Sequence, residues 1–279
     1  MYDGPFSVET NAEIVERLGV TNFAGAPTAY RMIVAAGADA AKPLANNLRV
    51  ASSAGEPLNP EVMRWFEQHV GCNLYDQYGQ TETGMVLCNH HGLHHDVRAG
   101  SAGYPLPGFR LAVVDDSGEP VTQGEQGILA IHRHDSPLFD FDGYLDREGQ
   151  DWVGDWYLTG DTVEQNSDGS ISFVGRSDDV ITSPGYRIGP FDVESCLIEH
   201  DAVAESAVVG KPDAERGEIV KAFVILNPGY VGNDPLAEEL KEHVRSRLGK
   251  HAFPRAIAFP EELPKTPSGK IQRFILRNA

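Results

Sequence analysis

The chain has 279 residues, of which 41% are hydrophobic, and a net charge of −18 at pH 7. A chain of this length buries a sizeable core and is expected to form more than one domain. The strong negative charge argues against general binding to nucleic acid. Because no run of about 18 apolar residues is present, no membrane span is expected. The N-terminal stretch lacks the basic start and apolar centre of a signal peptide.

The cysteines and the charge distribution indicate the cellular compartment and the kind of ligand. Cys72, Cys88 and Cys196 are widely spaced and odd in number, which argues against a disulfide framework. We therefore expect a reducing compartment, the cytoplasm, with the thiols buried as small hydrophobic side chains. Residues 241–279 hold nine Lys or Arg and three acids, a net of +6. Such a basic tail fits contact with an anionic small molecule, although a ligand-free basic surface explains the charge equally well.

Helices alternate with short strands over the first 90 residues. Apolar residues recur at helical spacing before Gly19, and the pairs Pro27…Gly37 and Asn59-Pro60…Gly71 supply start and stop signals. The pattern predicts helices over 7–19, 27–37 and 59–71, and strands over 20–25, 48–55 and 72–79. Alternation of this kind favours a mostly parallel sheet.

The second half of the chain changes pattern twice. Gly- and Asp-rich turns separate strands over 109–133, and Asp168-Gly169 predicts a hairpin over 161–176. Beyond these strands we expect a compact α+β pattern with helices over 190–200 and 234–249, and strands over 205–213, 218–227 and 255–263. The predicted class is therefore α/β plus α+β, with domains at 1–98 (αβ, incomplete), 99–177 (β-rich) and 178–279 (small α+β).

Four stretches carry residues suited to nucleotide chemistry: SAGEPL (53–58), YDQYGQTETG (75–84), YLTGD (157–161) with VGRSDDVITSPGYRIGPFDVE (174–194), and LPKTPSGKIQR (263–273). The last contains Ser268-Gly269-Lys270, which suggests phosphate binding. It is not a P-loop, because Pro264 and Ile271 stand where that motif needs Gly and Ser or Thr.

Several residues in these stretches have a direct chemical interpretation. The Tyr78 ring offers a face for stacking on adenine, although an aromatic residue after a strand is more often part of a core. The Thr81 hydroxyl can donate to a phosphate oxygen. Glu82 is a hard oxygen ligand suited to Mg²⁺ held partly by phosphates, or else a solvated glutamate. Asp161 can accept two hydrogen bonds from ribose hydroxyls, with Arg176 donating from the other side. Without a ligand, these two would be a turn aspartate and a surface ion pair.

Taken in this order, the four stretches strongly resemble the adenylate-forming enzymes, specifically the AMP-forming acyl-CoA synthetases. APTAYRM (26–32) and YGQTETG (78–84) are most similar to the medium-chain acid–CoA ligases, and the resemblance runs from about residue 7 to 277. It implies ATP, Mg²⁺ and CoA as cofactors or substrates and a small mobile C-terminal domain. It also implies two half-reactions: a carboxylic acid forms acyl-AMP with release of pyrophosphate, and CoA then forms the thioester.

The resemblance also assigns roles to individual residues. Lys270 would be the adenylation lysine, with Thr81 and Glu82 in the catalytic set. Asp178 would be the hinge, and Gly185, Tyr186 and Arg187 would face the pantetheine arm and phosphates of CoA. The implied nucleotide-binding residues are Gly55, Glu56, Pro57, Asp76, Gln77, Tyr78, Thr81, Asp161 and Arg176.

Gly79 has an implied place in the acid pocket, where acetyl-specific relatives carry tryptophan. We expect an open volume there and an acyl group longer than acetate, with a graded preference of about 0.8 kcal/mol per CH₂. His90, His91, His94 and His95 lie outside the family's motifs, and we interpret NHHGLHHD (89–96) as a polar loop rather than a metal site.

One departure from the family limits the functional prediction. Members carry a Ser/Thr-Gly-rich loop ending in Pro-Lys that wraps the β- and γ-phosphates, and no such loop is present in this sequence. The chain therefore resembles the C-terminal half of a synthetase and is expected to have little activity alone. An exposed sheet edge would favour self-association or a complementing N-terminal half. The alternatives are a non-catalytic nucleotide- or partner-binding module, and an adenylation domain that loads a carrier protein.

Overall fold

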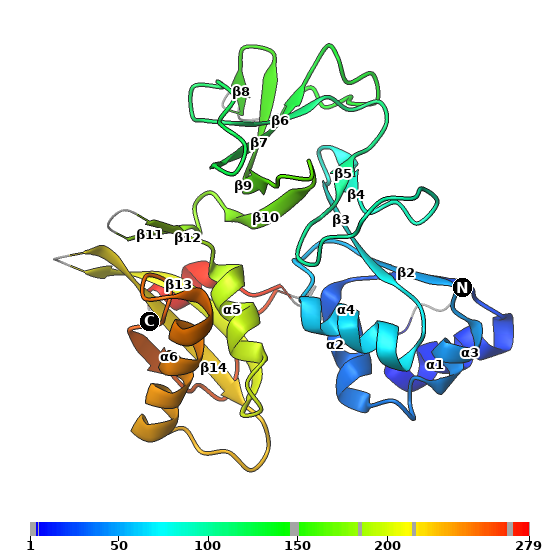
Figure 1. Cartoon of the computed structure of the whole chain (residues 1–279), viewed down its shortest axis with the longest axis vertical. Helices are drawn as coiled ribbons and strands as arrows, with labels where there is room; N and C mark the ends of the chain where they lie inside the picture. The colour runs from blue at the N-terminus through cyan, green and yellow to red at the C-terminus, as the bar shows by residue number, and fades with distance from the viewer. Residues whose placement is uncertain are drawn as a thin grey trace. The chain divides into compact units, whose positions relative to one another are not determined.

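The computed structural model describes residue 4 and residues 6–145, 151–183, 186–213, 216–266 and 270–278. Contacts divide the chain into two compact units (Figure 1). Unit 1 is Met1–Thr159 with Val163–Phe173, and unit 2 is Gly160–Thr162 with Val174–Ala279. The division runs through two strands, β9 (Trp156–Gln165) and β10 (Ile171–Arg176). It therefore lies slightly before the boundary predicted at residue 178.

The four helices of unit 1 begin and end where local chemistry directs. Ser7 caps the first helix by accepting a hydrogen bond from the Thr10 N–H, and Gly19 closes it in the left-handed conformation with φ 60°. Proline occupies the first turn of each of the other three. The three predicted helices are confirmed and a fourth is added: α1 (Val8–Leu18), α2 (Pro27–Ala36), α3 (Lys42–Asn47) and α4 (Pro60–His69).

The first sheet of unit 1 is mixed and has the strand order β1-β2-β3-β4-β5. β1, β2 and β3 run parallel, as predicted, whereas β3–β4 and β4–β5 pair antiparallel. β4 and β5 were not predicted. The bounds are β1 (Asn22–Gly25), β2 (Val50–Ser53), β3 (Leu74–Gln80), β4 (Gly84–Cys88) and β5 (Tyr104–Pro105).

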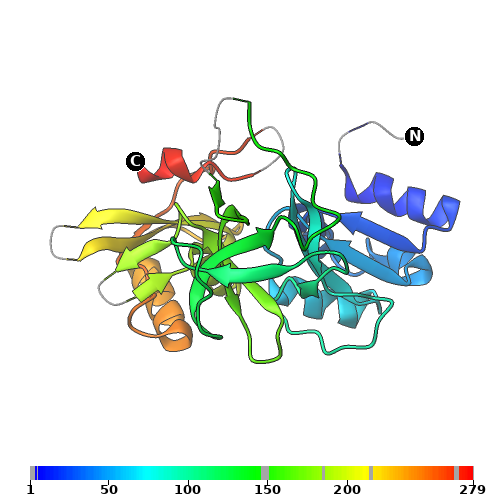
Figure 2. The ribbon, with the colours of Figure 1, turned by 90° about the horizontal axis from the view of Figure 1, so that it is seen from above.

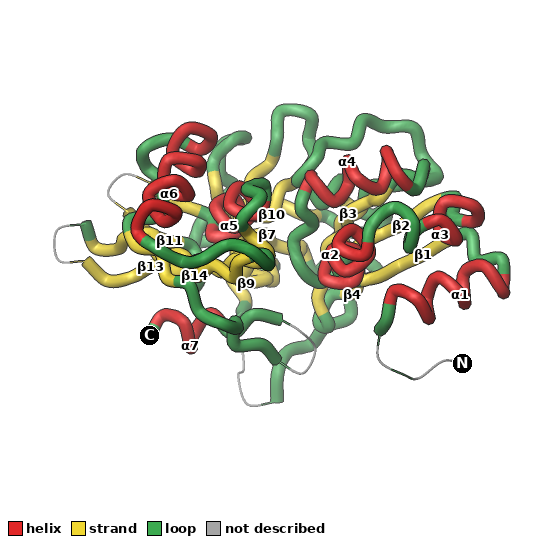
Figure 3. The backbone as a smooth tube through the Cα atoms, turned by 90° about the horizontal axis from the view of Figure 1, so that it is seen from below, coloured by secondary structure: helices red, strands yellow, loops and turns green. Residues whose placement is uncertain are grey.

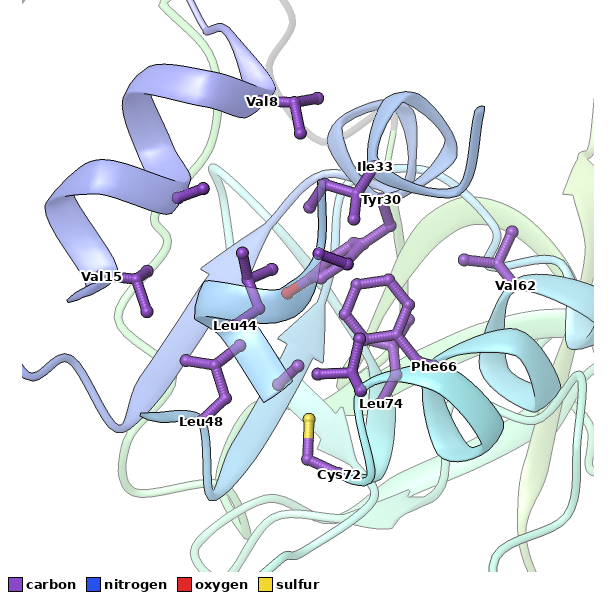
Figure 4. Close-up of a cluster of buried hydrophobic side chains, with 14 of the residues drawn as sticks. Val8, Val15, Tyr30, Ile33, Leu44, Leu48, Val62, Phe66, Cys72 and Leu74 are labelled. Atoms are coloured by element: carbon purple, nitrogen blue, oxygen red, sulfur yellow. The ribbon is translucent and has the colours of Figure 1, made fainter. Parts of the chain in front are cut away.

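A single apolar cluster joins the helices to this sheet (Figure 4). Phe23, Ala51 and Leu74 are in register on neighbouring strands and so share one face. Side chains of all four helices pack there, with Tyr30 and Phe66 fully buried. β2 ends at Ser53, where the SAGEPL stretch begins.

The second sheet has the order β10-β9-β7-β6, and β8 pairs with β9. Its core within unit 1 is apolar and aromatic and includes Leu129, Ile131 and Tyr157. The predicted strands and the hairpin through Asp168-Gly169 are confirmed. The bounds not yet given are β6 (Leu111–Val114), β7 (Gln126–His132) and β8 (Trp152–Val153).

Unit 2 holds a three-stranded sheet, β13-β14-β15, covered on both faces, and a two-stranded antiparallel sheet, β11-β12. Val208, Val220 and Ala222 belong to the cluster under α5 and α6, whereas Phe223 on the other face packs with Leu276 of α7. Figures 2 and 3 show α6 and α7 on opposite sides of the strands. The bounds are β11 (Ile181–Ser183), β12 (Tyr186–Ile188), α5 (Pro190–Ile198), β13 (Val203–Asp213), β14 (Gly217–Leu226), α6 (Asp234–Leu248), β15 (Ala256–Ala258) and α7 (Arg273–Arg277).

The cysteines and the helices bear on two expectations drawn from composition. Cys72, Cys88 and Cys196, all within the described ranges, are buried and free of disulfides, and burial raises the pKa of each thiol. Among the helices that the structure describes, none combines the length and apolar character needed to cross a bilayer.

Candidate functional site

The loop after β2 begins at the carboxyl edge of the parallel strands. Ser53 is in register with Asp76 on β3, so the SAGEPL and YDQYGQTETG stretches start side by side at one edge of the sheet. In open α/β sheets, ligands bind at the carboxyl ends of the strands. The fold of unit 1 therefore brings together the two stretches predicted to border adenine.

Glu56 stabilises this loop through hydrogen bonds to α2. Its Oε2 atom accepts hydrogen bonds from Thr28 Oγ1 at 3.0 Å and from Arg31 Nη2 at 3.2 Å. Gly55 has φ +95°, in the left-handed region that favours glycine. The Glu56 carboxylate is therefore bonded to α2. A ligand beside this loop would meet mainly its backbone and the ring of Pro57.

Asp76 is an acid in an unusually dry position. It is 8% exposed, and its Oδ1 atom accepts the Gln77 N–H at 3.0 Å. Burial raises the pKa of Asp76 to about 8, and backbone hydrogen bonds from Gln77 and Leu58 oppose the shift only in part. At neutral pH this side chain is therefore largely protonated, and it can both donate and accept a hydrogen bond.

Tyr78 lies half-buried at the margin of the second core. Its ring centroid is 6.3 Å from that of Phe173, at an interplanar angle of 30°, and it packs against the cluster around Leu129 and Ile131. This contact supports the simpler interpretation of an aromatic residue after a strand. Stacking on adenine stays a prediction.

The expectation of an open volume at Gly79 is wrong. A Cβ atom there would lie 2.2 Å from the Gly84 carbonyl oxygen and 2.8 Å from the Met85 Cα. β3 and β4 approach closely at a bulge between Tyr78 and Gly79, so backbone already fills the space. The glycine is required by this close approach, and its lack of a side chain says nothing about the length of the acyl group. Its place in an acid pocket stays a prediction.

Thr81 and Glu82 lie on the tight turn between β3 and β4. Thr81 is exposed and Glu82 is half-buried. The Tyr144 hydroxyl donates a hydrogen bond to Glu82 Oε1, and this bond raises the pKa of Tyr144. Sequence reasoning missed Tyr144, because 62 residues separate it from Glu82 and no local pattern links the two. The Tyr144 hydroxyl therefore orients the Glu82 carboxylate, which is partly shielded from solvent.

Thr83 stabilises the same turn from inside and was also missed. It is 6% exposed; its Oγ1 atom accepts the Gln80 N–H at 3.1 Å and donates to the Gly84 carbonyl at 2.8 Å. Gln80 in turn donates through Nε2 to the Thr159 carbonyl at 2.9 Å. These bonds fix the backbone that presents Thr81 and Glu82.

Asp161 and Arg176 lie on neighbouring strands of unit 2 and contact each other. Arg176 Nη1 is 3.3 Å from Asp161 Oδ1, and the side chains are 52% and 5% exposed, respectively. Gly160, with φ +70°, leaves room for the guanidinium beside the strand. The predicted ribose residues therefore meet directly in this structure, where they form an ion pair with one buried and one exposed member.

The predicted hinge and CoA residues follow in the chain. The Asp178 side chain is 74% exposed, and its carbonyl accepts a hydrogen bond from Arg277. The Tyr186 ring stacks on His251, with centroids 4.5 Å apart and an interplanar angle of 14°, and Arg187 is exposed. Gly185 lies outside the described residues.

Lys270 is exposed, and its backbone bonds to Thr266; we call the described residues 263–266 and 270–272 the Lys270 turn. The Lys270 N–H donates to Thr266 Oγ1 at 3.1 Å, and its carbonyl accepts the Thr266 N–H at 2.8 Å. An antiparallel bridge joins Lys265 to Ile271. Ser268 and Gly269 lie outside the described residues. Thr266 thus bonds to both the N–H and the carbonyl of Lys270, and the Lys270 side chain is exposed to solvent.

The histidine-rich loop is organised by hydrogen bonds to backbone. The two ring nitrogens of His95 contact the carbonyls of His90, at 3.2 Å, and of Asp96, at 3.0 Å. Within the described ranges, no group of three or more His, Cys, Asp or Glu side chains is arranged to hold a metal ion.

With these features described, comparison with known sequences gives the class of the protein. The chain belongs to the AMP-binding enzyme family, whose profile matches residues 3–144. The profile of the AMP-binding enzyme C-terminal domain matches residues 192–270. The resemblance seen in the four motifs is confirmed at this level.

Three relatives are representative. The mitochondrial acyl-coenzyme A synthetase ACSM3 of Rattus norvegicus is 44% identical over 271 residues, 95% of this chain and 46% of its own length. The crystal structure of the Brucella canis acyl-CoA synthetase is 60% identical with a TM-score of 0.64, covering 99% of this chain and 51% of that one. The anthranilate CoA ligase AuaEII, solved with anthranoyl-AMP, is 33% identical with a TM-score of 0.84 and covers 100% and 52%.

Two consequences follow from these comparisons. The predicted fold, a partial large domain followed by a small C-terminal domain of the adenylate-forming type, is confirmed. The chain spans about half the length of the curated relatives it matches.

Proposed function

We propose that this protein is an AMP-forming carboxylic acid–CoA ligase. The likeness of the whole chain to a ligase solved with its acyl-adenylate, AuaEII with anthranoyl-AMP, carries the proposal. The described residues are chemically suited to it. Buried Asp161 beside Arg176 offers a ribose acceptor and donor, and exposed Lys270 stands in a tail of net charge +6. The substrates would be ATP, a carboxylic acid of medium chain length or similar size, and CoA.

The proposed chemistry has two steps. A carboxylate oxygen of the acid attacks the α-phosphorus of ATP, and the bond to the pyrophosphate oxygen breaks. The CoA thiol, after losing its proton, attacks the acyl carbonyl, and AMP leaves. The first step brings two anions together and so needs positive charge directed at the transition state. Lys270 supplies that charge, and the Thr81 hydroxyl donates to a phosphate oxygen.

Glu82 is the residue we propose for holding Mg²⁺. It is half-buried and already accepts a hydrogen bond from the Tyr144 hydroxyl, so its carboxylate is oriented by the protein. A single carboxylate together with substrate phosphates is a usual way of binding this ion. When bound, the ion would neutralise phosphate charge.

Domain rotation about Asp178, with Gly185, Tyr186 and Arg187 on the CoA side, belongs to the same proposal. So do the nucleotide contacts of Gly55, Glu56, Pro57, Asp76, Gln77 and Tyr78, a complementing N-terminal half or self-association as the partner, and a cytoplasmic setting. The Asp178 side chain is 74% exposed, which fits a hinge, and its described contacts are an Arg176 ion pair at 3.8 Å and the bond from Arg277 to its carbonyl.

The test is acid-dependent exchange between ATP and labelled pyrophosphate over a panel of acids from C2 to C12. The panel is run with and without the upstream half of a relative supplied as a second chain. Acid-dependent exchange in either sample supports the proposal, and transfer to CoA rather than to a carrier protein identifies the acceptor. Tight AMP binding without exchange in both samples would instead indicate the non-catalytic module.

A further inference from the structure

Four charged side chains of unit 2 form a largely buried network beside the predicted hinge. Glu194 of α5 and Asp179 are 8% and 15% exposed, and Arg273 and Arg277 of α7 are 25% and 31% exposed. Two carboxylates therefore face two guanidinium groups. Buried charges are retained only where partners and hydrogen bonds offset their desolvation, and removal of one partner is strongly destabilising.

Glu194 is the centre of this network. Both of its carboxylate oxygens lie 2.8 Å from Arg273 Nη2. Oε1 also accepts the backbone N–H of Val208 at 2.7 Å. One carboxylate thus joins α5, strand β13 and the start of α7.

Asp179 forms the second half. Arg277 donates to its carboxylate and also to the carbonyl of Asp178. Arg273 Nη1 lies 3.9 Å from Asp179 Oδ2. Because Arg273 and Arg277 are four residues apart, they project from the same side of α7. Both ends of this short helix are therefore tied to the segment that carries the hinge.

The same helix begins three residues after Lys270. Between them, the Gln272 N–H donates to the Pro264 carbonyl at 2.8 Å. On the opposite side of α7, Leu276 packs with Leu263 and Phe223. The C-terminal end of the Lys270 turn is therefore continuous with α7, and Ile271 packs with the same apolar cluster as Leu276.

We propose that Glu194, Asp179, Arg273 and Arg277 form a clamp that fixes the Lys270 turn to the chain at Asp178. The turn and the C-terminal side of the hinge then move as one body, and the pivot is confined to residues before Asp179. Arg273 and Glu194 are positioning residues for Lys270. The effect on catalysis rests on the proposed function, whereas the mechanical link does not.

The mechanical link is tested by hydrogen exchange on the full chain. R273K keeps the charge but loses the fork geometry, and E194Q keeps the shape and the acceptor for Val208. Both are expected to speed amide exchange in residues 263–272 by about tenfold, with strand β14 unchanged. K265M is the matched control, because it removes the 2.8 Å ion pair between Lys265 on the same turn and Glu205 of β13. Its amide exchange is expected to stay within about twofold of the parent.

Several outcomes would overturn the clamp. Exchange within about twofold of the parent in R273K and E194Q means that the network does not hold the turn. Parallel loss of protection in the turn and in β14 means that these residues serve general stability only. If R273K and E194Q fail to fold, R277M at the more exposed end takes their place, with the same expected pattern.

A second experiment, on the two half-reactions, distinguishes failure of the clamp from failure of the proposed function. In a preparation active in acid-dependent pyrophosphate exchange, R273K slows that exchange by about tenfold and slows thioester formation from supplied acyl-adenylate by less than about twofold. Equal slowing of both steps contradicts a positioning role. A parent sample without pyrophosphate exchange contradicts the proposed function instead, and hydrogen exchange alone then decides the clamp.

Discussion

Asp76, Glu82 and Asp161 are carboxylic acids in three different environments. Asp76 is buried with backbone donors only, Glu82 is half-buried against a tyrosine hydroxyl, and Asp161 is buried beside a guanidinium. Burial without a cation favours the protonated acid, whereas a neighbouring cation favours the carboxylate. The three therefore suit different tasks: a hydrogen bond to a base edge, a metal ligand and a ribose acceptor.

The effect of Asp76→Asn on the pH dependence of the free energy of unfolding tests the buried environment of Asp76. The pKa of Asp76 rises from 3.8 to about 8 in the folded chain, so the unfolded chain releases this proton first. The contribution of Asp76 to the parent's stability is therefore greatest below about pH 4 and falls as pH rises toward 8. Asn cannot ionise, so the variant should lose this part of the decline, and each unit of pKa shift corresponds to about 1.4 kcal/mol.

Urea unfolding at pH 5 and pH 8 measures the effect. The gain of the variant over the parent should be larger at pH 8. Asp96→Asn is the control, since Asp96 is exposed in the same unit and should leave the pH dependence unchanged. An equal effect of Asp76→Asn at the two pH values would show that this acid is not held protonated by the fold.

At the level of elements, the β3–β4 pair is the most constrained part of the site. The bulge at Gly79 brings two backbones together, and hydrogen bonds through Thr83 fix the turn that follows. Thr81 and Glu82 are thus presented by rigid backbone, which is what precise contact with phosphates requires.

Gly79→Ala tests this constraint. The new methyl group would meet the Gly84 carbonyl at 2.2 Å, so we expect a loss of about 1–3 kcal/mol in the free energy of unfolding from overpacking. Gly92→Ala is the matched control, because nothing lies within 4 Å of a Cβ there. Both are compared by urea unfolding, and equal stability of the two variants would show that the strands separate easily.

The sequence predicted most helices and strands because their signals are local. The N-caps Ser7, Asn59 and Asn233 are each followed by an apolar stripe at helical spacing, and both signals lie within a few residues of each other. β4 and α7 were missed because they are short and are held by tertiary contacts: pairing with β3 in one case, and the Glu194–Arg273 contact in the other.

The same distinction holds for the site. The residue types for nucleotide chemistry are visible in four motifs. Tyr144 on Glu82, the clamp on α7 and the backbone that fills the space at Gly79 all depend on residues distant in sequence. At Gly79 the expectation fails because residue type alone does not show that the Gly84 backbone lies against the glycine.

For the whole molecule, we propose that Lys270 serves adenylation and not thioester formation. In a sample active in acid-dependent exchange, Lys270→Ala should reduce ATP–pyrophosphate exchange by at least about 100-fold, because it removes a charge directed at the transition state. Thioester formation from supplied acyl-adenylate and CoA should stay within about threefold of the parent, since that step needs no such charge. Lys250→Ala, an exposed lysine of the same basic tail, should leave both steps unchanged. Undiminished pyrophosphate exchange in Lys270→Ala, or equal loss of both half-reactions, would contradict this role of Lys270.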